Sequence, residues 1–149
     1  MQNGKHYRKP GGVQHERRTK KTVLNEHQAL FNEWVHRLGL DGWHMIFNDM
    51  CRLEDLPIKD STGTTTWVSS TRCAVIDIVD PQFLSKYGVG REFDFETVLV
   101  HELLHCVFSL LDNGNDNDNV EDRVLHQIID DLARAFVDAK RNGGCNSAG

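Results

Sequence analysis

Three residues in one short segment combine metal-binding side chains with a side chain that can move a proton. The segment "FDFETVLVHELLHCVFSLL", residues 93–111, is apolar around most of its helical circumference, yet it contains His101, Glu102 and His105. A helix with apolar residues on every face is normally enclosed by its protein, and each enclosed polar group left unsatisfied costs about 1–3 kcal/mol. We therefore expect a ligand that satisfies these side chains, rather than a chance occurrence on an ordinary helix.

The spacing of the two histidines predicts that this ligand is a metal ion. Residues four apart lie on the same face of an α-helix, so His101 and His105 can bind one ion together. The pattern H-E-x-x-H is typical of sites where two neutral imidazoles bind zinc and the glutamate, not itself a ligand, takes a proton from a zinc-bound water. We predict Zn²⁺ as the cofactor, His101 and His105 as its ligands, and Glu102 as the catalytic general base.

A catalytic zinc site needs a third protein ligand if its fourth position is to hold water. The helix expected after residue 119 offers three candidates near its start: Glu121, Asp122 and His126. Its apolar residues repeat at helical spacing: Leu125, Ile128 and Leu132. Because these lie 4, 7 and 11 residues after Glu121, the same core-facing stripe includes Glu121. We assign Glu121 as the third ligand. His126 and Asp122 remain alternatives for this position or as neighbours of the ligands.

Length and composition indicate one small domain. The chain has 149 residues, of which 39% are hydrophobic, enough for a single core. No apolar run approaches the roughly 18–20 residues of a transmembrane helix, and the N-terminus lacks the apolar stretch of a signal peptide, so we expect a cytoplasmic protein without membrane contact. Its cysteines form no C-x-x-C pair, and we expect free thiols with Cys106 in the core: Cys51, Cys73, Cys106 and Cys145.

The charge is unevenly distributed along the chain. Residues 1–21 contain seven Lys or Arg residues and one Glu, a net charge of +6, so the rest must carry −11 to give the total of −5. Because this segment has hardly any large apolar residue, we expect a disordered basic tail. It is suited to a weak, salt-sensitive contact with nucleic acid, or it only increases solubility.

From residue 22 the apolar residues follow regular periods. "NEHQALFNEWVHRLGL" predicts a helix with Asn25 as N-cap and Gln28 as its N3 partner. Its apolar face comprises Leu30, Phe31, Trp34, Val35 and Leu38. Three β-rich segments follow, "WHMIFN", "TTTWVSS" and "CAVIDIVD", of which the first and last alternate in polarity. They predict a short mixed sheet.

The two remaining helices flank a polar loop. Asp94 can cap the helix that contains the histidines, which we expect to reach about Leu111. Residues 112–119, "DNGNDNDN", read as a loop that lacks the Gly and Glu of a calcium-binding loop at the required positions. The last helix is expected to run from about Val120 to Lys140. The domain therefore spans residues 22–141, and residues 142–149 form a flexible C-terminal tail.

The element order and the motif together resemble a family. A helix, a short sheet, "ETVLVHELLH" on a second helix, an acidic loop and a third helix opening with "VEDRVLH" resemble the small zincin-type metallopeptidases often encoded by phages and prophages, related in plan to the ImmA and SprT-like groups. The resemblance covers roughly residues 22–140. The chain lacks the Gly-His-Gly segment and the zinc ribbon of SprT-like proteins, which favours the ImmA-like arrangement with a carboxylate ligand.

The resemblance implies an α+β, minimal zincin-like domain and a zinc-dependent endopeptidase. A protein or peptide substrate would pair along an exposed sheet edge, in the host cytoplasm if the chain is phage-encoded. The oxyanion formed during hydrolysis needs a donor, for which Tyr87, His44 and His126 are candidates. Two other classes remain open: a non-catalytic binding protein stabilised by zinc, and a nucleic-acid-associated accessory factor that uses residues 1–21.

Overall fold

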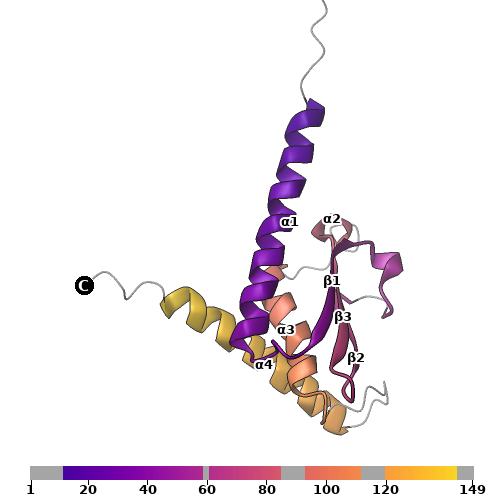
Figure 1. The fold of residues 1–149 in the computed structure, drawn as a ribbon, viewed down its shortest axis with the longest axis vertical. Coiled ribbons are helices and arrows are strands. Elements are labelled where there is room, and N and C mark those ends of the chain that lie inside the picture. The colour runs from indigo at the N-terminus through magenta and orange to yellow at the C-terminus, as the bar shows by residue number, and fades with distance from the viewer. Residues whose placement is uncertain (1–11, 59–60, 85–92, 112–119, 144–149) are drawn as a thin grey trace, which may run out of the picture.

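The protein consists of helices and one small mixed sheet (Figure 1). The computed structural model describes residues 12–58, 61–84, 93–111 and 120–143. The elements in chain order are α1 (Gly12–Arg37), β1 (His44–Cys51), the short 3-10 helix η1 (Leu53–Asp55), β2 (Gly63–Val68), β3 (Cys73–Val79), α2 (Pro81–Leu84), α3 (Phe95–Val107) and α4 (Val120–Gly143). The α+β class and the three-stranded mixed sheet predicted from the sequence are thereby confirmed.

The sheet has the strand order β1-β3-β2, with β3 in the centre. β3 is parallel to β1 and antiparallel to β2. Ala74, Ile76 and Ile78 of β3 are buried in the hydrophobic core that the sheet shares with the helices. On the opposite face, Ile46 and Val68 are 51% and 53% exposed. The helices therefore cover one face of the sheet, and the alternation in polarity predicted for residues 43–48 and 73–79 is confirmed.

The first helix is longer than the sequence pattern indicated. α1 begins at Gly12 and passes through Asn25 without interruption, so the predicted N-cap at Asn25 is wrong. Residues 12–21, which the sequence assigned to a basic tail, form the first part of α1, while residues 1–11 lie outside the described chain. A helix anchored by the buried Phe31 and Trp34 can extend towards its N-terminus at one hydrogen bond per added residue, without a new nucleation step. Figure 1 shows this N-terminal part of α1 projecting beyond the other elements.

The helix that contains the H-E-x-x-H motif begins as predicted and ends earlier. Asp94 is the N-cap of α3, and its carboxylate accepts hydrogen bonds from the backbone N–H groups of Glu96 and Thr97. The helix ends at Val107 rather than near Leu111, because Phe108 leaves the helical conformation at φ −92° and ψ 11°. The two histidines and Glu102 thus lie in the central turns of α3.

The core-facing side of the last helix is rotated from the predicted stripe, of which Leu125 and Leu132 still pack partly buried against the core. Its buried residues are Ile129, Ala133 and Val137, spaced by four residues on one face. Ile128, which the sequence pattern placed in the core-facing stripe, is 44% exposed. The apolar surface of α4 is therefore wider than the buried face. The helix ends at Gly143, three residues later than expected, and residues 144–149 lie outside the described part.

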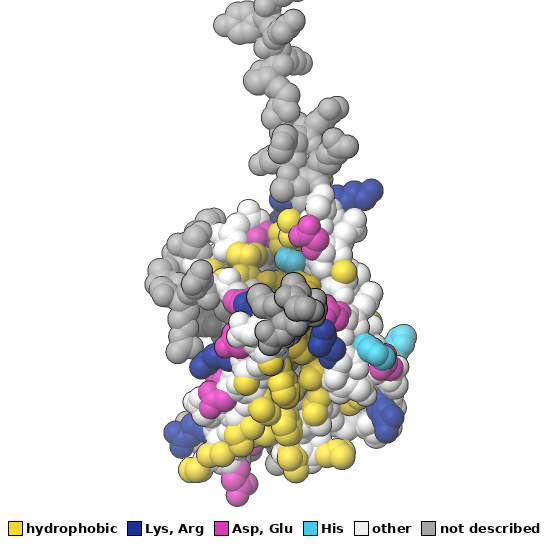
Figure 2. Space-filling view, turned by 90° about the vertical axis from the view of Figure 1, so that its left-hand side faces the viewer, with side chains coloured by type: hydrophobic (Ala, Val, Ile, Leu, Met, Phe, Trp, Pro, Cys, Tyr) yellow, Lys and Arg dark blue, Asp and Glu magenta, His cyan; other side chains and the backbone are white. Residues whose placement is uncertain are grey.

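Exposed apolar side chains of α4 include Val124, Ile128 and Phe136. Figure 2 shows hydrophobic side chains gathered on the side of the molecule towards which the C-terminal end of α4 points. Among the helices that the structure describes, none has both the length and the apolar character needed to cross a membrane. Of the four cysteines, Cys51, Cys73 and Cys106 are free thiols as predicted, and Cys106 is in the core; Cys145 lies beyond the described residues.

A cluster of charged residues joins the C-terminal end of α4 to the start of α3. Lys140 Nζ lies 2.6 Å from Glu96 Oε1, a carboxylate that also accepts a 2.8 Å hydrogen bond from the Trp34 indole of α1. Arg141 donates to both carboxylate oxygens of Asp94, at 2.7 and 2.9 Å. These bonds hold the pKa of Asp94 below its usual value. Because the contacts fix α4 against α3 at one end, they also help to set how the two helices meet at the other.

Candidate metal centre

His101 and His105 lie on successive turns of α3, with their side chains next to each other. The Nε2 atoms of His101 and His105 lie 3.2 Å apart, and the two rings meet edge to face with centroids separated by 5.1 Å. Both side chains are partly buried. Two nitrogens bound tetrahedrally to one zinc ion, at about 2.0–2.1 Å each, lie about 3.3–3.4 Å from one another. The pair predicted from the motif therefore has the spacing of a zinc chelate.

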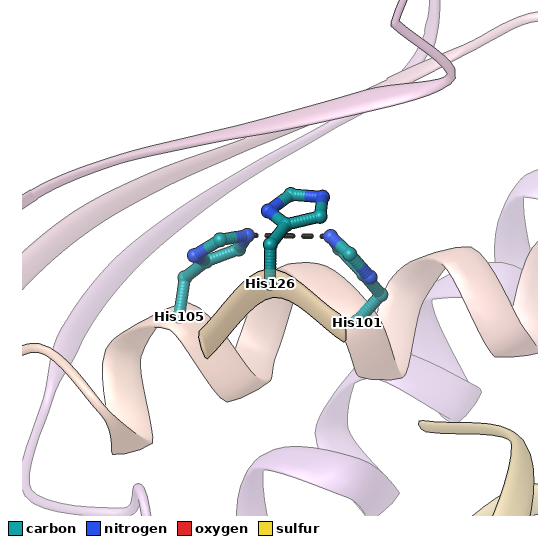
Figure 3. A group of neighbouring side chains, drawn as sticks. All are labelled: His101, His105 and His126. Atoms are coloured by element: carbon teal, nitrogen blue, oxygen red, sulfur yellow. Dashed lines mark hydrogen bonds between the residues drawn. The ribbon is translucent and has the colours of Figure 1, made fainter. Parts of the chain in front are cut away.

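The third side chain at this place is His126 of α4. Its ring centroid lies 4.8 Å from that of His101 and 5.4 Å from that of His105. One ligand nitrogen from each of the three histidines can be chosen so that all lie within 4.8 Å of one another. Figure 3 shows the three rings converging from the two helices. A modest inward movement of His126 would give the three-nitrogen set of a zinc site with one open position.

The prediction that Glu121 is the third ligand is not supported by this arrangement. Glu121 is exposed and does not belong to the group of potential ligands. The difference follows from the rotation of α4: its buried residues are Ile129, Ala133 and Val137, and His126, although exposed, lies three residues before Ile129 on the side of the helix that approaches the two histidines of α3. Asp122 is half-buried one turn before His126 and is also not a member of the group.

The environment of His101 favours the neutral form that binds a metal. Burial lowers the pKa of His101 to about 4, and the neighbouring imidazoles of His105 and His126 act in the same direction. A neutral imidazole has one nitrogen with a free lone pair, which is what a metal ion requires.

Asp130 determines which ring nitrogen of His101 can bind a metal ion. Its Oδ1 atom lies 2.9 Å from His101 Nδ1. If Nδ1 carries the hydrogen and donates it to Asp130, the Nε2 atom that faces His105 is free to bind a metal. Asp130 was not identified from the sequence. The only sequence signal was its spacing of four residues from His126, which places both on one face of α4.

Glu102 lies in a buried position between α3 and β2. It is 5% exposed, and Thr65 Oγ1 lies 2.7 Å from its Oε2 atom and 2.9 Å from its backbone oxygen. Burial raises the pKa of Glu102 to about 7, partly offset by the hydrogen bond from Thr65. A carboxylic acid with a pKa close to neutrality suits a group that accepts and returns a proton at pH 7.

The strand β2 supplies further neighbours that sequence reasoning missed. Trp67 stacks on His105, with 5.9 Å between the ring centroids and 20° between the planes. Gly63 lies so close to Glu102 that an added Cβ would be 2.8 Å from Oε1. Gly63, Thr65 and Trp67 alternate along "GTTTWV" and so share one face of the strand. The alternation was visible in the sequence, but the contacts with α3 were not.

Tyr87, His44 and His126 were the candidates for a donor to the oxyanion, and the structure places them differently. Tyr87 lies outside the described residues. His44 begins β1, on the far side of the central strand from β2, and is exposed, so the structure does not bring it to the histidine group. His126 is placed among the candidate ligands instead.

Comparison of the chain with protein-family models, with curated proteins and with solved structures found no match. The assignment of a function therefore depends on the chemistry of the site itself.

Proposed function

We propose that the protein is a zinc-dependent endopeptidase. The observation that carries this proposal is the combination of three convergent histidines with a buried carboxylate on the same helix as two of them. Three nitrogen ligands and one open position are typical of catalytic zinc, whereas structural zinc sites are usually closed by four protein ligands. A group that can move a proton has no role in a purely structural site, so Glu102 supports catalysis.

In this proposal His101, His105 and His126 hold the zinc ion. When bound, zinc supplies a Lewis acid that polarises a carbonyl group and lowers the pKa of a coordinated water to about 7. Glu102 accepts a proton from the attacking water and then donates it to the nitrogen of the departing amine. Asp130 keeps Nε2 of His101 directed at the metal through the bond at Nδ1.

The position of β2 supports an extended peptide as the substrate. β2 is at one end of the strand order, so within the described part of the chain no further strand pairs with its outer main-chain groups. The same strand contacts both Glu102 and His105 through Thr65 and Trp67. A peptide that adds to this edge through main-chain hydrogen bonds would pass close to the candidate metal centre. A peptide that pairs with a strand edge is held through its main chain rather than through either terminus, which is why we propose an endopeptidase.

The test combines metal analysis with turnover of an unstructured peptide. We expect about one zinc per chain in protein purified without added metal, and zinc-dependent cleavage of an unstructured protein such as casein. Glu102→Gln should keep its zinc and lose at least about 100-fold in kcat. A zinc-loaded protein whose wild-type and Glu102→Gln forms are equally inactive would instead be a zinc-stabilised binding protein.

A contact with nucleic acid is a second candidate function. Lys20 and Lys21 are exposed residues of the N-terminal half of α1, and residues 1–21 have a net charge of +6. Such a segment is suited to weak binding of phosphate groups that decreases as salt rises.

A further inference from the structure

We propose that Thr65 is a positioning residue for Glu102, and that Gly63 provides the space in which the carboxylate lies. The inference rests on the proposed function, because it concerns how the general base is held. It assigns to the inner face of β2 a role in catalysis that differs from pairing with a peptide at the strand's outer edge.

The first observation is the pair of contacts made by one hydroxyl group. Thr65 Oγ1 lies 2.9 Å from the backbone oxygen of Glu102 and 2.7 Å from its Oε2 atom. Both oxygens belong to the same residue, and the hydroxyl shares its one hydrogen between them, so a single group links the end of the Glu102 side chain to its own main chain. This link restricts the rotation of a side chain that otherwise has three rotatable bonds. It therefore fixes the carboxylate relative to α3, the helix that also carries His101 and His105.

The second observation is the absence of a side chain at Gly63. A Cβ atom there would lie 2.8 Å from Oε1 and 2.9 Å from Cγ of Glu102, closer than such contacts occur. The backbone does not require glycine at this position, because the positive φ found at Gly39 is not found at Gly63. The requirement is therefore for space. Alanine at residue 63 would push the carboxylate out of the place where Thr65 holds it.

The three consecutive threonines of β2 provide a matched comparison. Successive side chains of a strand point to opposite faces, so Thr64 faces away from α3. Thr64 is 3% exposed, and its hydroxyl oxygen has no hydrogen-bond partner within the described chain. Replacing Thr64 by valine keeps the shape and removes a hydroxyl that bonds to nothing described. Replacing Thr65 by valine also keeps the shape, but removes the link to Glu102.

The experiment compares the zinc-loaded variants Thr65→Val, Thr65→Ser and Thr64→Val in peptide turnover. We expect Thr65→Val to lower kcat about 10- to 100-fold with KM within about threefold, because a small displacement of a catalytic group affects the reaction more than substrate binding. Thr65→Ser retains the hydroxyl and should recover kcat to within about threefold of wild type, and Thr64→Val should stay within about twofold. Zinc content should be unchanged in all three variants.

Two results would overturn the inference: full kcat in Thr65→Val, or equal impairment of Thr65→Ser and Thr65→Val. If Thr65→Val does not fold, Thr65→Ala takes its place in the same comparison with Thr65→Ser. Gly63→Ala should lower kcat in the same way while zinc binding is retained, and wild-type kcat in that variant would contradict the proposed need for space.

A measurement without metal separates this inference from the proposed function. In the metal-free protein, Thr65→Val should lower the melting temperature by about 3–6 °C, since it removes hydrogen bonds to a buried residue. In a Glu102→Met background only the contact of Thr65 with the main-chain oxygen of residue 102 remains, so the decrease should be smaller. If the wild-type protein cleaves no peptide, the proposed function fails, while this cycle still decides whether Thr65 holds Glu102. Equal decreases in both backgrounds would refute the link.

Discussion

The identity of the third zinc ligand is the sharpest test of the candidate centre, because the sequence pattern favoured Glu121 whereas the geometry favours His126. Removal of His126 by alanine deletes one of three ligand nitrogens that lie within 4.8 Å of one another. Loss of a group that only orients a ligand typically weakens metal binding about 10- to 100-fold. We therefore expect His126→Ala to weaken zinc binding by more than about 100-fold, equivalent to more than about 2.7 kcal/mol.

The same loss should appear in the thermal stability. Zinc at about 1,000 times its Kd stabilises the folded state by about 4.1 kcal/mol, whereas a 100-fold weaker site at the same zinc concentration retains only about 1.4 kcal/mol. At about 2–4 °C for each kcal/mol, the increase in Tm on adding zinc should be smaller in His126→Ala by about 5–10 °C. Because the difference is taken between zinc-loaded and metal-free samples of each variant, any effect of the substitution on packing cancels.

Competition with a chelating dye gives the Kd, and calorimetry gives the Tm. Glu121→Ala should bind zinc like the wild type, and Asp130→Asn should lose about 10- to 100-fold. His36→Ala is the matched control, since the His36 side chain is 82% exposed and pairs with Asp41. If Glu121→Ala releases the metal while His126→Ala retains it, the assignment made from the geometry is wrong.

Three further outcomes are expected. Arg141→Met should destabilise the protein by about 0.5–1 kcal/mol at pH 7, since the Arg141 side chain is 47% exposed and solvent screens its ion pairs with Asp94 and Glu96. Because the pKa values of both carboxylates are lowered in the folded state, the difference in unfolding free energy should shrink as the pH falls through them. In the metal-free protein, the pKa of Glu102 is raised from 4.5 to about 7, so ionisation of this acid disfavours the folded state as the pH rises. The free energy of unfolding of Glu102→Gln should therefore increase relative to that of the wild type by up to about 3 kcal/mol between pH 4 and 8, measured by denaturant titration. Replacing Lys20 and Lys21 by Glu should weaken binding to a DNA duplex at low salt and leave peptide turnover within about twofold of wild type. A severalfold rise in turnover would instead indicate that the basic segment inhibits the candidate metal centre.

Features set by neighbouring residues were predictable from the sequence. The cap at Asp94 requires only a carboxylate next to free backbone N–H groups, and the histidine pair requires only a spacing of four on a helix. The buried row Ala74, Ile76 and Ile78 likewise follows from the two-residue period of a strand. Each of these depends on local geometry alone.

The rotation of α4 could not be read from the same kind of pattern. Its larger apolar residues, Leu125, Ile128 and Leu132, gave the stronger signal, yet the buried face is centred on Ile129 and Ala133, Leu125 and Leu132 only border it, and Ile128 is exposed. Ala133 is 1% exposed, and a small side chain there lets α4 approach its neighbours closely. Which of two apolar flanks is buried depends on this fit between elements and not on hydrophobicity alone.

Contacts between distant residues were also beyond the sequence pattern. Thr65 and Glu102 are 37 residues apart, and their hydrogen bond exists only because β2 lies against α3. The extension of α1 to Gly12 has a similar origin, since anchoring of its C-terminal half in the core supports a segment whose composition alone indicated disorder.

The strand order has a consequence for the sequence of events in folding. Val68 pairs with Cys73 only five residues later, through a tight turn, whereas His44 pairs with the same residue 29 positions away. The entropy lost on closing a loop grows with its length, and a hairpin forms in about 1–10 μs. We therefore expect β2 and β3 to pair first in refolding and β1 to join an already formed edge. During synthesis, the strand that leaves the ribosome first would then be the last of the three to be fixed in the sheet.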